Sequence, residues 1–211
     1  MGIESRQLPA DVKFRYQKDT RFQTLVDHGI GTELSTSGYC WAACLDMALS
    51  PFIPDEVVRN GIITDSVKDG RLGKDAFTEI GGLARDRIGD LVDVVNGRLL
   101  AQDFRARLKL IKGQPFDKFH LELQKGRTVI FGAQDKDGGH VWVMDRVYQD
   151  GGKYIYAAYD PAIEDPLEAR TYFDNFQLYG YYMFSDTKIL PFIISVGTEE
   201  NQVIDSGQKG E

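Results

Sequence analysis

Apolar and polar positions follow different periods in the N-terminal and C-terminal halves of the chain. Helical spacing of apolar residues predicts helices over residues 37–49, 54–60, 74–88 and 117–124. Short apolar or alternating runs predict strands over residues 128–131, 140–148, 153–159, 169–173 and 179–184. Gly-rich turns at 137–139 and 150–152 separate the first of these strands at short spacing, which indicates an antiparallel meander.

The remaining segments give weaker patterns. Residues 12–16 and 91–95 read as short strands, residues 96–97 as a turn, and residues 101–110 as a helix or irregular segment. Helices followed by strands predict an α+β fold, with a helical half packed on one side of a C-terminal antiparallel sheet. We expect a single domain over residues 1–196 and a disordered tail over residues 197–211, which contains almost no apolar residues.

Composition and charge exclude several classes of partner. The chain has 211 residues, 42% of them hydrophobic and 27% charged, which is typical of a soluble globular protein. Its net charge is -7 and its pI about 5.1, and it has no basic patch, so nucleic acid and anionic membrane are not expected partners. The apolar run at 189–196 is too short to span a bilayer.

The two cysteines, Cys40 and Cys44, lie four residues apart on one predicted helix, where side-chain geometry does not suit a disulfide. A reducing compartment is therefore expected. The first residues lack a basic region followed by an apolar run, so we expect a cytoplasmic protein or one exported without a cleavable signal peptide.

Cys40 is a candidate nucleophile because of its position. A small polar loop at 35–38 leads directly into it, and the following residues favour a helix. The unpaired amides of a helix's first turn carry partial positive charge, which stabilises a thiolate. The alternative is a buried structural cysteine, which is the common situation for a free cysteine; Cys44 is expected to be such a core residue.

A thiol nucleophile needs a base, and His140 is the best placed of three histidines. It follows two glycines and begins the clearest strand, whereas His28 lies in a polar turn and His120 in the middle of a predicted helix. The hairpin that follows returns residues near 160 to the vicinity of 140–142. Asp160 ends that strand because Pro161 cannot continue a ladder, so Asp160 is expected to accept a hydrogen bond from the imidazole.

These residues resemble a known family. The segment Tyr39-Cys40-Trp41-Ala42-Ala43 is similar to the nucleophile signature of papain-like cysteine peptidases, most nearly the bacterial group often called C39-like. The later blocks, residues 117–130, residues 139–143 and a strand ending at Asp160-Pro161, follow in that group's order. The resemblance covers residues 35–50 and 115–162.

This resemblance implies a papain-like fold and a cysteine peptidase without a cofactor or metal. Cys40 would be the nucleophile, His140 the general base and then general acid, and Asp160 the orienting residue. The implied reaction is attack of the thiolate on a peptide or isopeptide carbonyl, followed by hydrolysis of an acyl-enzyme. The expected partner is a protein or peptide substrate.

The chain departs from the family at the oxyanion donor. The family has a glutamine several residues before the cysteine, six before it in papain, and here that position is Leu34. Other candidates for the donor are the side chains of Gln23, Thr36 and Ser37 and the Cys40 amide. Trp41 and Trp142 are candidates to line the substrate cleft. Period two places Trp142 on the same strand face as His140, and core packing is the alternative for Trp41.

Three alternatives remain open at this point. A zinc site from Cys40, Cys44 and His140 lacks the fourth ligand that a structural site requires. A papain-fold binding or effector module without turnover would explain the missing glutamine. Transglutaminase-like acyl transfer would use the same triad with an amine in place of water.

Overall fold

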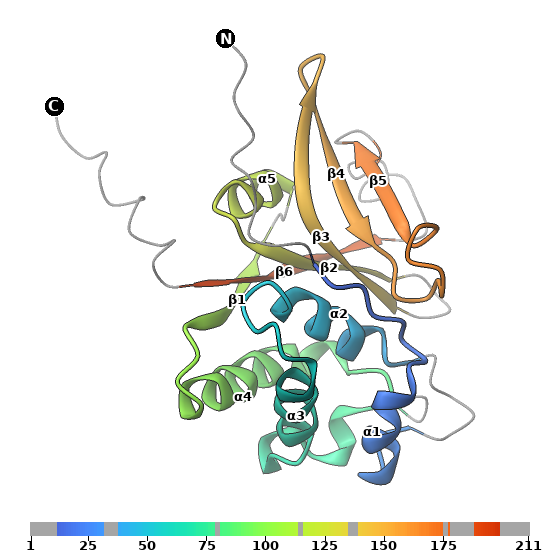
Figure 1. Ribbon diagram of the computed structural model, residues 1–211, viewed down its shortest axis with the longest axis vertical. Helices are drawn as coiled ribbons and strands as arrows, with labels where there is room; N and C mark the ends of the chain where they lie inside the picture. The colour runs from blue at the N-terminus through green and yellow to red at the C-terminus, as the bar shows by residue number, and fades with distance from the viewer. Residues whose placement is uncertain are drawn as a thin grey trace, which may run out of the picture.

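The computed structural model describes residues 12–31, 38–78, 81–113, 116–134, 139–174, 177 and 188–198. Its centre is a six-stranded antiparallel sheet in the order β1-β6-β2-β3-β4-β5 (Figure 1). The strands are β1 Ala106–Lys112, β2 Thr128–Gln134, β3 Gly139–Asp150, β4 Lys153–Tyr159, β5 Arg170–Asp174 and β6 Lys188–Thr198. The predicted antiparallel meander corresponds to β2 through β5, and the mixed α+β class is confirmed.

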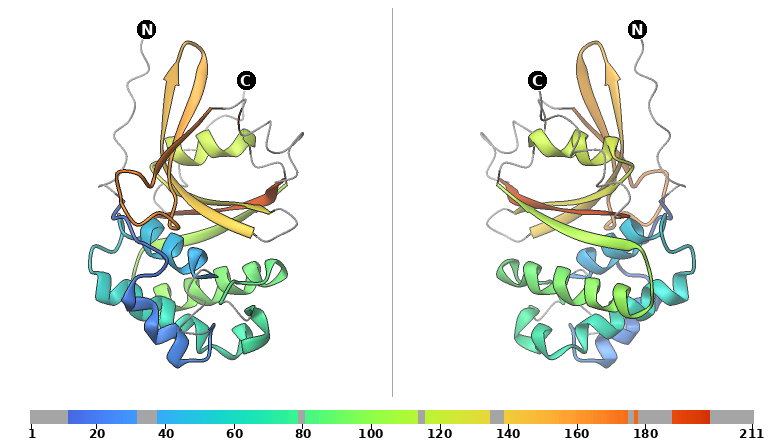
Figure 2. Two further views of the ribbon diagram at one scale, coloured as in Figure 1. Left: turned by 90° about the vertical axis from the view of Figure 1, so that its right-hand side faces the viewer. Right: turned by 90° about the vertical axis from the view of Figure 1, so that its left-hand side faces the viewer.

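Helices cover both faces of this sheet. They are α1 Gln23–Asp27, α2 Cys40–Leu49, α3 Glu56–Val67, α4 Ile88–Ala101 and α5 Phe116–Gln124, with 3-10 turns at Thr20–Phe22, Gly70–Leu72, Lys74–Ala76 and Arg85–Arg87. Along β2, Ile130 packs into the core formed with α2, α3 and α4, whereas Val129 and Phe131 pack with Phe119 of α5. Figure 2 shows α5 on the opposite side of the sheet from the other helices. The expectation of helices on one side only is therefore wrong.

The predicted helix over 74–88 is not formed. Lys74–Ala76 is a single 3-10 turn, Phe77 makes an isolated antiparallel bridge with Leu83, and α4 begins only at Ile88. Gly81 has a φ of +83°, which is outside the right-handed helical region. The apolar spacing in this segment thus comes from a looped chain that packs inward, not from a helix.

The segment after it also differs from the prediction. Residues 91–95 and 96–97 lie inside α4. Of residues 101–110, predicted as a helix or irregular segment, Ala101 ends α4 and residues 106–110 belong to β1. Leu91, Val94 and Val95 are buried at the spacing of three and four that one helix face presents. Burial of this face outweighs the strand preference of the valines.

The remaining differences concern a short predicted strand, the bounds of α3 and the C-terminal segment. Residues 12–16 form no strand. Helix α3 begins at Glu56, where Asp55 accepts from the amides of Val57 and Val58 and caps its start, and it runs to Val67, beyond the predicted end at 60. The apolar run at 189–196 belongs to β6, which inserts between β1 and β2. Gly197 and Thr198 continue β6, so the predicted disordered tail does not begin at 197. Residues 199–211 and the predicted strand 179–184 lie outside the described residues.

Candidate active site

Cys40 is the first residue of α2, a helix in which all ten residues are buried. Cys40 retains 9% exposure, whereas Cys44 one turn later is fully enclosed. The first backbone amides of a helix lack partners within it and point toward its N-terminal end. The start of α2 therefore presents a sulfur atom at the edge of the core in a field that favours negative charge.

The two aromatic residues that flank Cys40 fix the start of α2. Tyr39 is buried and its hydroxyl donates to the backbone carbonyl of Ile30. Trp41 donates from Nε1 to the carbonyl of Gly81 at 2.9 Å. Gly81 lies so close to Tyr39 that a β-carbon on it would come within 2.3 Å of the ring. The loop around Gly81 thus packs directly against the residues on either side of Cys40.

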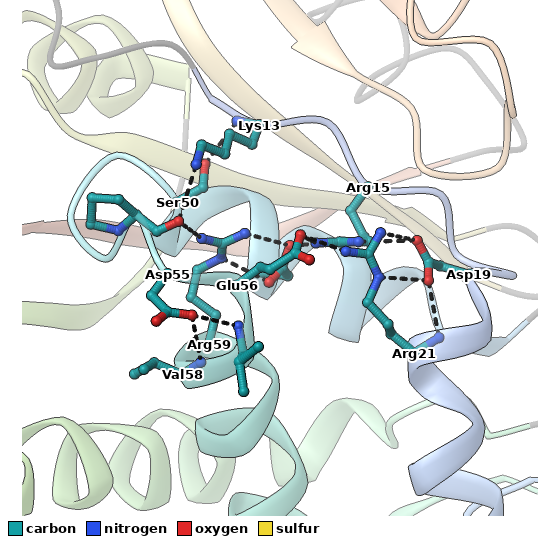
Figure 3. A network of polar contacts seen from close by, with 12 residues as sticks. Lys13, Arg15, Asp19, Arg21, Ser50, Asp55, Glu56, Val58 and Arg59 are labelled. Atoms are coloured by element: carbon teal, nitrogen blue, oxygen red, sulfur yellow. Dashed lines mark hydrogen bonds and ion pairs between the residues drawn. The ribbon is translucent and has the colours of Figure 1, made fainter.

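Buried charges hold the middle of the same helix. Asp46 accepts from Nε of Arg59 at 2.8 Å and from Nε of Arg15 at 3.0 Å. Arg59 is fully buried and also donates to the carbonyls of Ile53 and Pro54. Figure 3 shows how this network links α3 and the segment before α1 around α2. The network fixes α2 from the side away from the sheet.

His140 and Asp160 meet at the ends of neighbouring strands. His140 is the second residue of β3, and Asp160 directly follows β4. Nε2 of His140 lies 2.7 Å from Oδ1 of Asp160. Oδ1 also accepts from the backbone amide of Ala162 at 2.8 Å, and Oδ2 accepts from Nε1 of Trp142 at 3.1 Å. The carboxylate is thereby oriented by donors from three residues.

Trp142 contacts both members of this pair. Its ring meets the His140 ring edge to face, with centroids 4.5 Å apart. His140 and Trp142 therefore lie on one side of β3, as period two predicts. Because Nε2 of His140 is bound to the carboxylate, Nδ1 is the ring nitrogen left to interact with Cys40.

The electrostatics of the three groups are coupled. Burial acts to lower the pKa of His140, but hydrogen bonds with Asp160 and Cys40, together with their charges, raise it to about 9. Burial acts to raise the pKa of Asp160, but hydrogen bonds from His140, Ala162 and Trp142 hold it below its usual value. This arrangement favours a protonated imidazole beside an ionised Asp160 carboxylate.

Cys44 has a different environment. Its thiol lies 3.4 Å from the carbonyl oxygen of Val141 in β3. Burial, assisted by the charges of Cys40 and Asp160, raises the pKa of the Cys44 thiol well above its ordinary value. Cys44 is therefore held as a neutral thiol that packs α2 against the sheet.

The other predicted residues are less closely connected to this centre. Trp41 is buried and packs on Phe77, with ring centroids 5.5 Å apart. Gln23 is exposed at the start of α1, and within the described part of the chain no hydrogen bond ties it to Cys40 or His140. Thr36 and Ser37 lie outside the described residues. His120 stacks on Tyr154, with ring centroids 4.9 Å apart, on the α5 side of the sheet, and His28 is the C-terminal cap of α1.

Sequence reasoning did not single out Gln17. This residue is buried, and its backbone amide donates to the carbonyl of Pro161, next to Asp160. Its Oε1 has no hydrogen-bond partner among the described residues. No local pattern marks Gln17, because its burial depends on contact with a segment far along the chain.

None of the helices in the described ranges combines the length and apolar character needed to cross a bilayer. Comparison of the sequence with protein-family models gave no match, and comparison with curated proteins gave none either.

Proposed function

We propose that this chain is a thiol-dependent hydrolase with a papain-like fold, in which Cys40, His140 and Asp160 form a catalytic triad. The observation that carries the proposal is the hydrogen bond between His140 Nε2 and Asp160 Oδ1, with Cys40 acting on the same imidazole. A nucleophile, a base and a group that orients the base are the three parts that acyl transfer requires. They come from a helix start and from two strand ends that are far apart in the sequence.

The proposed reaction begins with the Cys40 thiolate. Sulfur attacks the carbonyl carbon of a peptide or isopeptide bond, and a carbon–sulfur bond forms as the carbonyl electrons move to oxygen. The carbon–nitrogen bond then breaks, and protonated His140 gives its proton to the leaving amine. The product at this stage is a thioester on Cys40.

Water completes the cycle. Neutral His140 takes a proton from the water as its oxygen attacks the thioester, and the sulfur leaves as a thiolate. Asp160 stays ionised throughout and keeps the imidazole in place through Nε2. The backbone amide of Cys40 at the start of α2 is a donor for the developing oxyanion.

The buried environment supports this assignment of roles. A raised His140 pKa keeps the imidazole protonated at neutral pH, which suits a thiolate–imidazolium pair. Full burial of Cys44, by contrast, suits a structural role. The resemblance of residues 39–43 and 139–143 to papain-like peptidases agrees with the same division.

One observation favours a second candidate. Leu34 stands at the position six before Cys40, where a glutamine donor would be expected. A binding or effector module without turnover would have no need of that donor. Transglutaminase-like transfer remains a variant of the first proposal, with an amine as the acceptor.

The proposal is tested by product analysis. The protein is incubated with an unfolded protein mixture, with and without a primary amine, and new peptide termini are identified by mass spectrometry. We expect new termini that are absent with Cys40→Ala, and Cys44→Ala is the matched control that should retain them. Incorporated amine would identify transfer. Identical products from the wild type and Cys40→Ala would contradict the catalytic proposal and favour the binding module.

A further inference from the structure

The ladder between β3 and β4 contains one irregular step. From the hairpin turn, pairing is regular as far as Arg146 opposite Ala157, but the next pair is Met144 opposite Ala158. Asp145 is therefore an extra residue with no opposite partner on β4. This geometry is a β-bulge, which shifts the register of everything beyond it by one.

The shift decides which face of the sheet Asp160 lies on. The last observed pair is Val143 with Tyr159, and one further step places Asp160 opposite Trp142, on the His140 face. A regular ladder from the same turn would instead place Asp160 opposite Val143, which packs into the α2 core on the other face. A slip of one residue exchanges the two faces of a strand.

A buried ion pair anchors the bulge. Asp145 is 5% exposed, and its Oδ1 accepts from Nη2 of Arg170 at 2.5 Å. Arg170 begins β5, and its guanidinium lies 4.2 Å from the centre of the Tyr159 ring, at the end of β4. The backbone carbonyl of Ala169, the residue before it, accepts a hydrogen bond from the backbone amide of Asp160 at 2.9 Å. The same short segment therefore holds both the bulge and Asp160.

We propose that Asp145 and Arg170 are positioning residues for the candidate triad. Their ion pair holds Asp145 out of the β3–β4 ladder and so keeps Asp160 on the same face as His140. Neither residue touches the reacting atoms, and both act through the register of the hairpin. The inference rests on the proposed function, because that function is what gives the contact between Asp160 and His140 a catalytic role.

The test measures the pKa of His140 by NMR titration of the imidazole signals in the full chain. Arg170→Gln should lower this pKa from about 9 by about one unit or more, because the Asp160 carboxylate would no longer be held in hydrogen-bonding position beside the His140 ring. Arg146→Gln is the matched control. This variant also removes a cation near Asp145. Because the Arg146 side chain is 44% exposed and its Nε lies 3.7 Å from Oδ2 of Asp145, the pKa of His140 should not change. A folded Arg170→Gln protein with an unchanged His140 pKa would overturn the inference.

A second variant distinguishes positioning from general stability. Deletion of Asp145 in the Arg170→Gln background removes the extra residue, so a regular ladder again places Asp160 opposite Trp142. This double variant should fold and recover the raised His140 pKa. A double variant that does not fold, or that folds with a His140 pKa near the ordinary 6.5, contradicts the inference.

Asp160→Ala separates this inference from the function on which it rests. If Asp160→Ala lowers the pKa of His140 and Arg170→Gln does not, only the positioning role fails. If Asp160→Ala has no effect on that pKa, the Asp160–His140 pair itself is refuted, and the proposed function fails with it.

Discussion

His140 and Asp160 are 20 positions apart in the sequence, yet Nε2 of the first lies 2.7 Å from Oδ1 of the second. The contact exists because a long hairpin returns the chain to the start of β3. Nδ1 of His140 is not used in this contact, and hydrogen bonding with Cys40 as well as with Asp160 raises the pKa of the same imidazole. The relationship therefore makes His140 the link between a carboxylate and a thiol.

Replacement of Asp160 should change both the rate and its pH dependence. In the wild type the protonated imidazole is lost as the pH rises through about 9, so kcat/KM should fall above that pH. In Asp160→Ala the fall should move toward 6.5, with a loss in kcat/KM of about 10²-fold at neutral pH. Asp160→Asn keeps one acceptor for Nε2 and should lie between them. A pH–rate profile measures all three, and coincident profiles would contradict the account.

Asp46→Asn should be strongly destabilising. The substitution leaves the buried guanidinium groups of Arg15 and Arg59 without their shared charge, which should lower the free energy of unfolding by about 3–5 kcal/mol. Asp65→Asn is the matched control, because its pair with Lys68 is about half exposed and should contribute little. Urea denaturation compares the two, and equal small effects would show that the network does not hold α2.

Gly81→Ala should disturb the start of α2. A β-carbon at this position meets the Tyr39 ring at 2.3 Å, and the φ of +83° is unfavourable for alanine. We expect a loss of about 1–3 kcal/mol in unfolding free energy and slower alkylation of Cys40. Gly61→Ala is the control, since nothing lies within 4 Å of that position in α3. Thermal unfolding should show Gly61→Ala unchanged or stabilised, and equal behaviour of the two variants would argue against the close contact.

Asn96→Asp should weaken the sheet edge. The Asn96 side chain donates to the Leu108 carbonyl and accepts from the Leu108 amide, both at 2.8 Å, and so occupies the outer edge of β1. Aspartate loses the donor and faces the carbonyl with a negative charge, at a cost of about 1–3 kcal/mol. Gly97→Ala, with no neighbour within 4 Å, controls for substitution in the same turn of α4. Unchanged urea midpoints for Asn96→Asp would contradict this role.

The back half of the fold could be predicted where local pattern and turn chemistry agree. Residues 153–159 form β4 with the predicted bounds, and α5 lies within one residue of its prediction. In the N-terminal half, the prediction failed where tertiary contacts determine the secondary structure. Asn96-Gly97 has the composition of a turn, but Asn96 is inside α4 because its side chain pairs with β1.

The candidate site likewise has a part that local sequence patterns predict and a part that depends on contacts between distant segments. A cysteine before a helical run and a histidine after two glycines mark Cys40 and His140 locally, and the predicted hairpin returns residues near 160 to the vicinity of His140. The register of that hairpin depends on the bulge at Asp145, which no local pattern shows because it is anchored by Arg170 in another strand. The burial of Gln17 likewise depends on a contact with Pro161.

The central claim is that His140 activates Cys40, and the rate of alkylation at each cysteine tests it most directly. The folded protein is treated with iodoacetamide at neutral pH, and labelling of Cys40 and Cys44 is followed by mass spectrometry in the wild type and in His140→Ala. We predict that Cys40 is labelled far faster than Cys44 in the wild type and that His140→Ala removes the difference. Equally slow labelling of both cysteines in the wild type, or fast labelling of Cys40 that persists in His140→Ala, would contradict the claim.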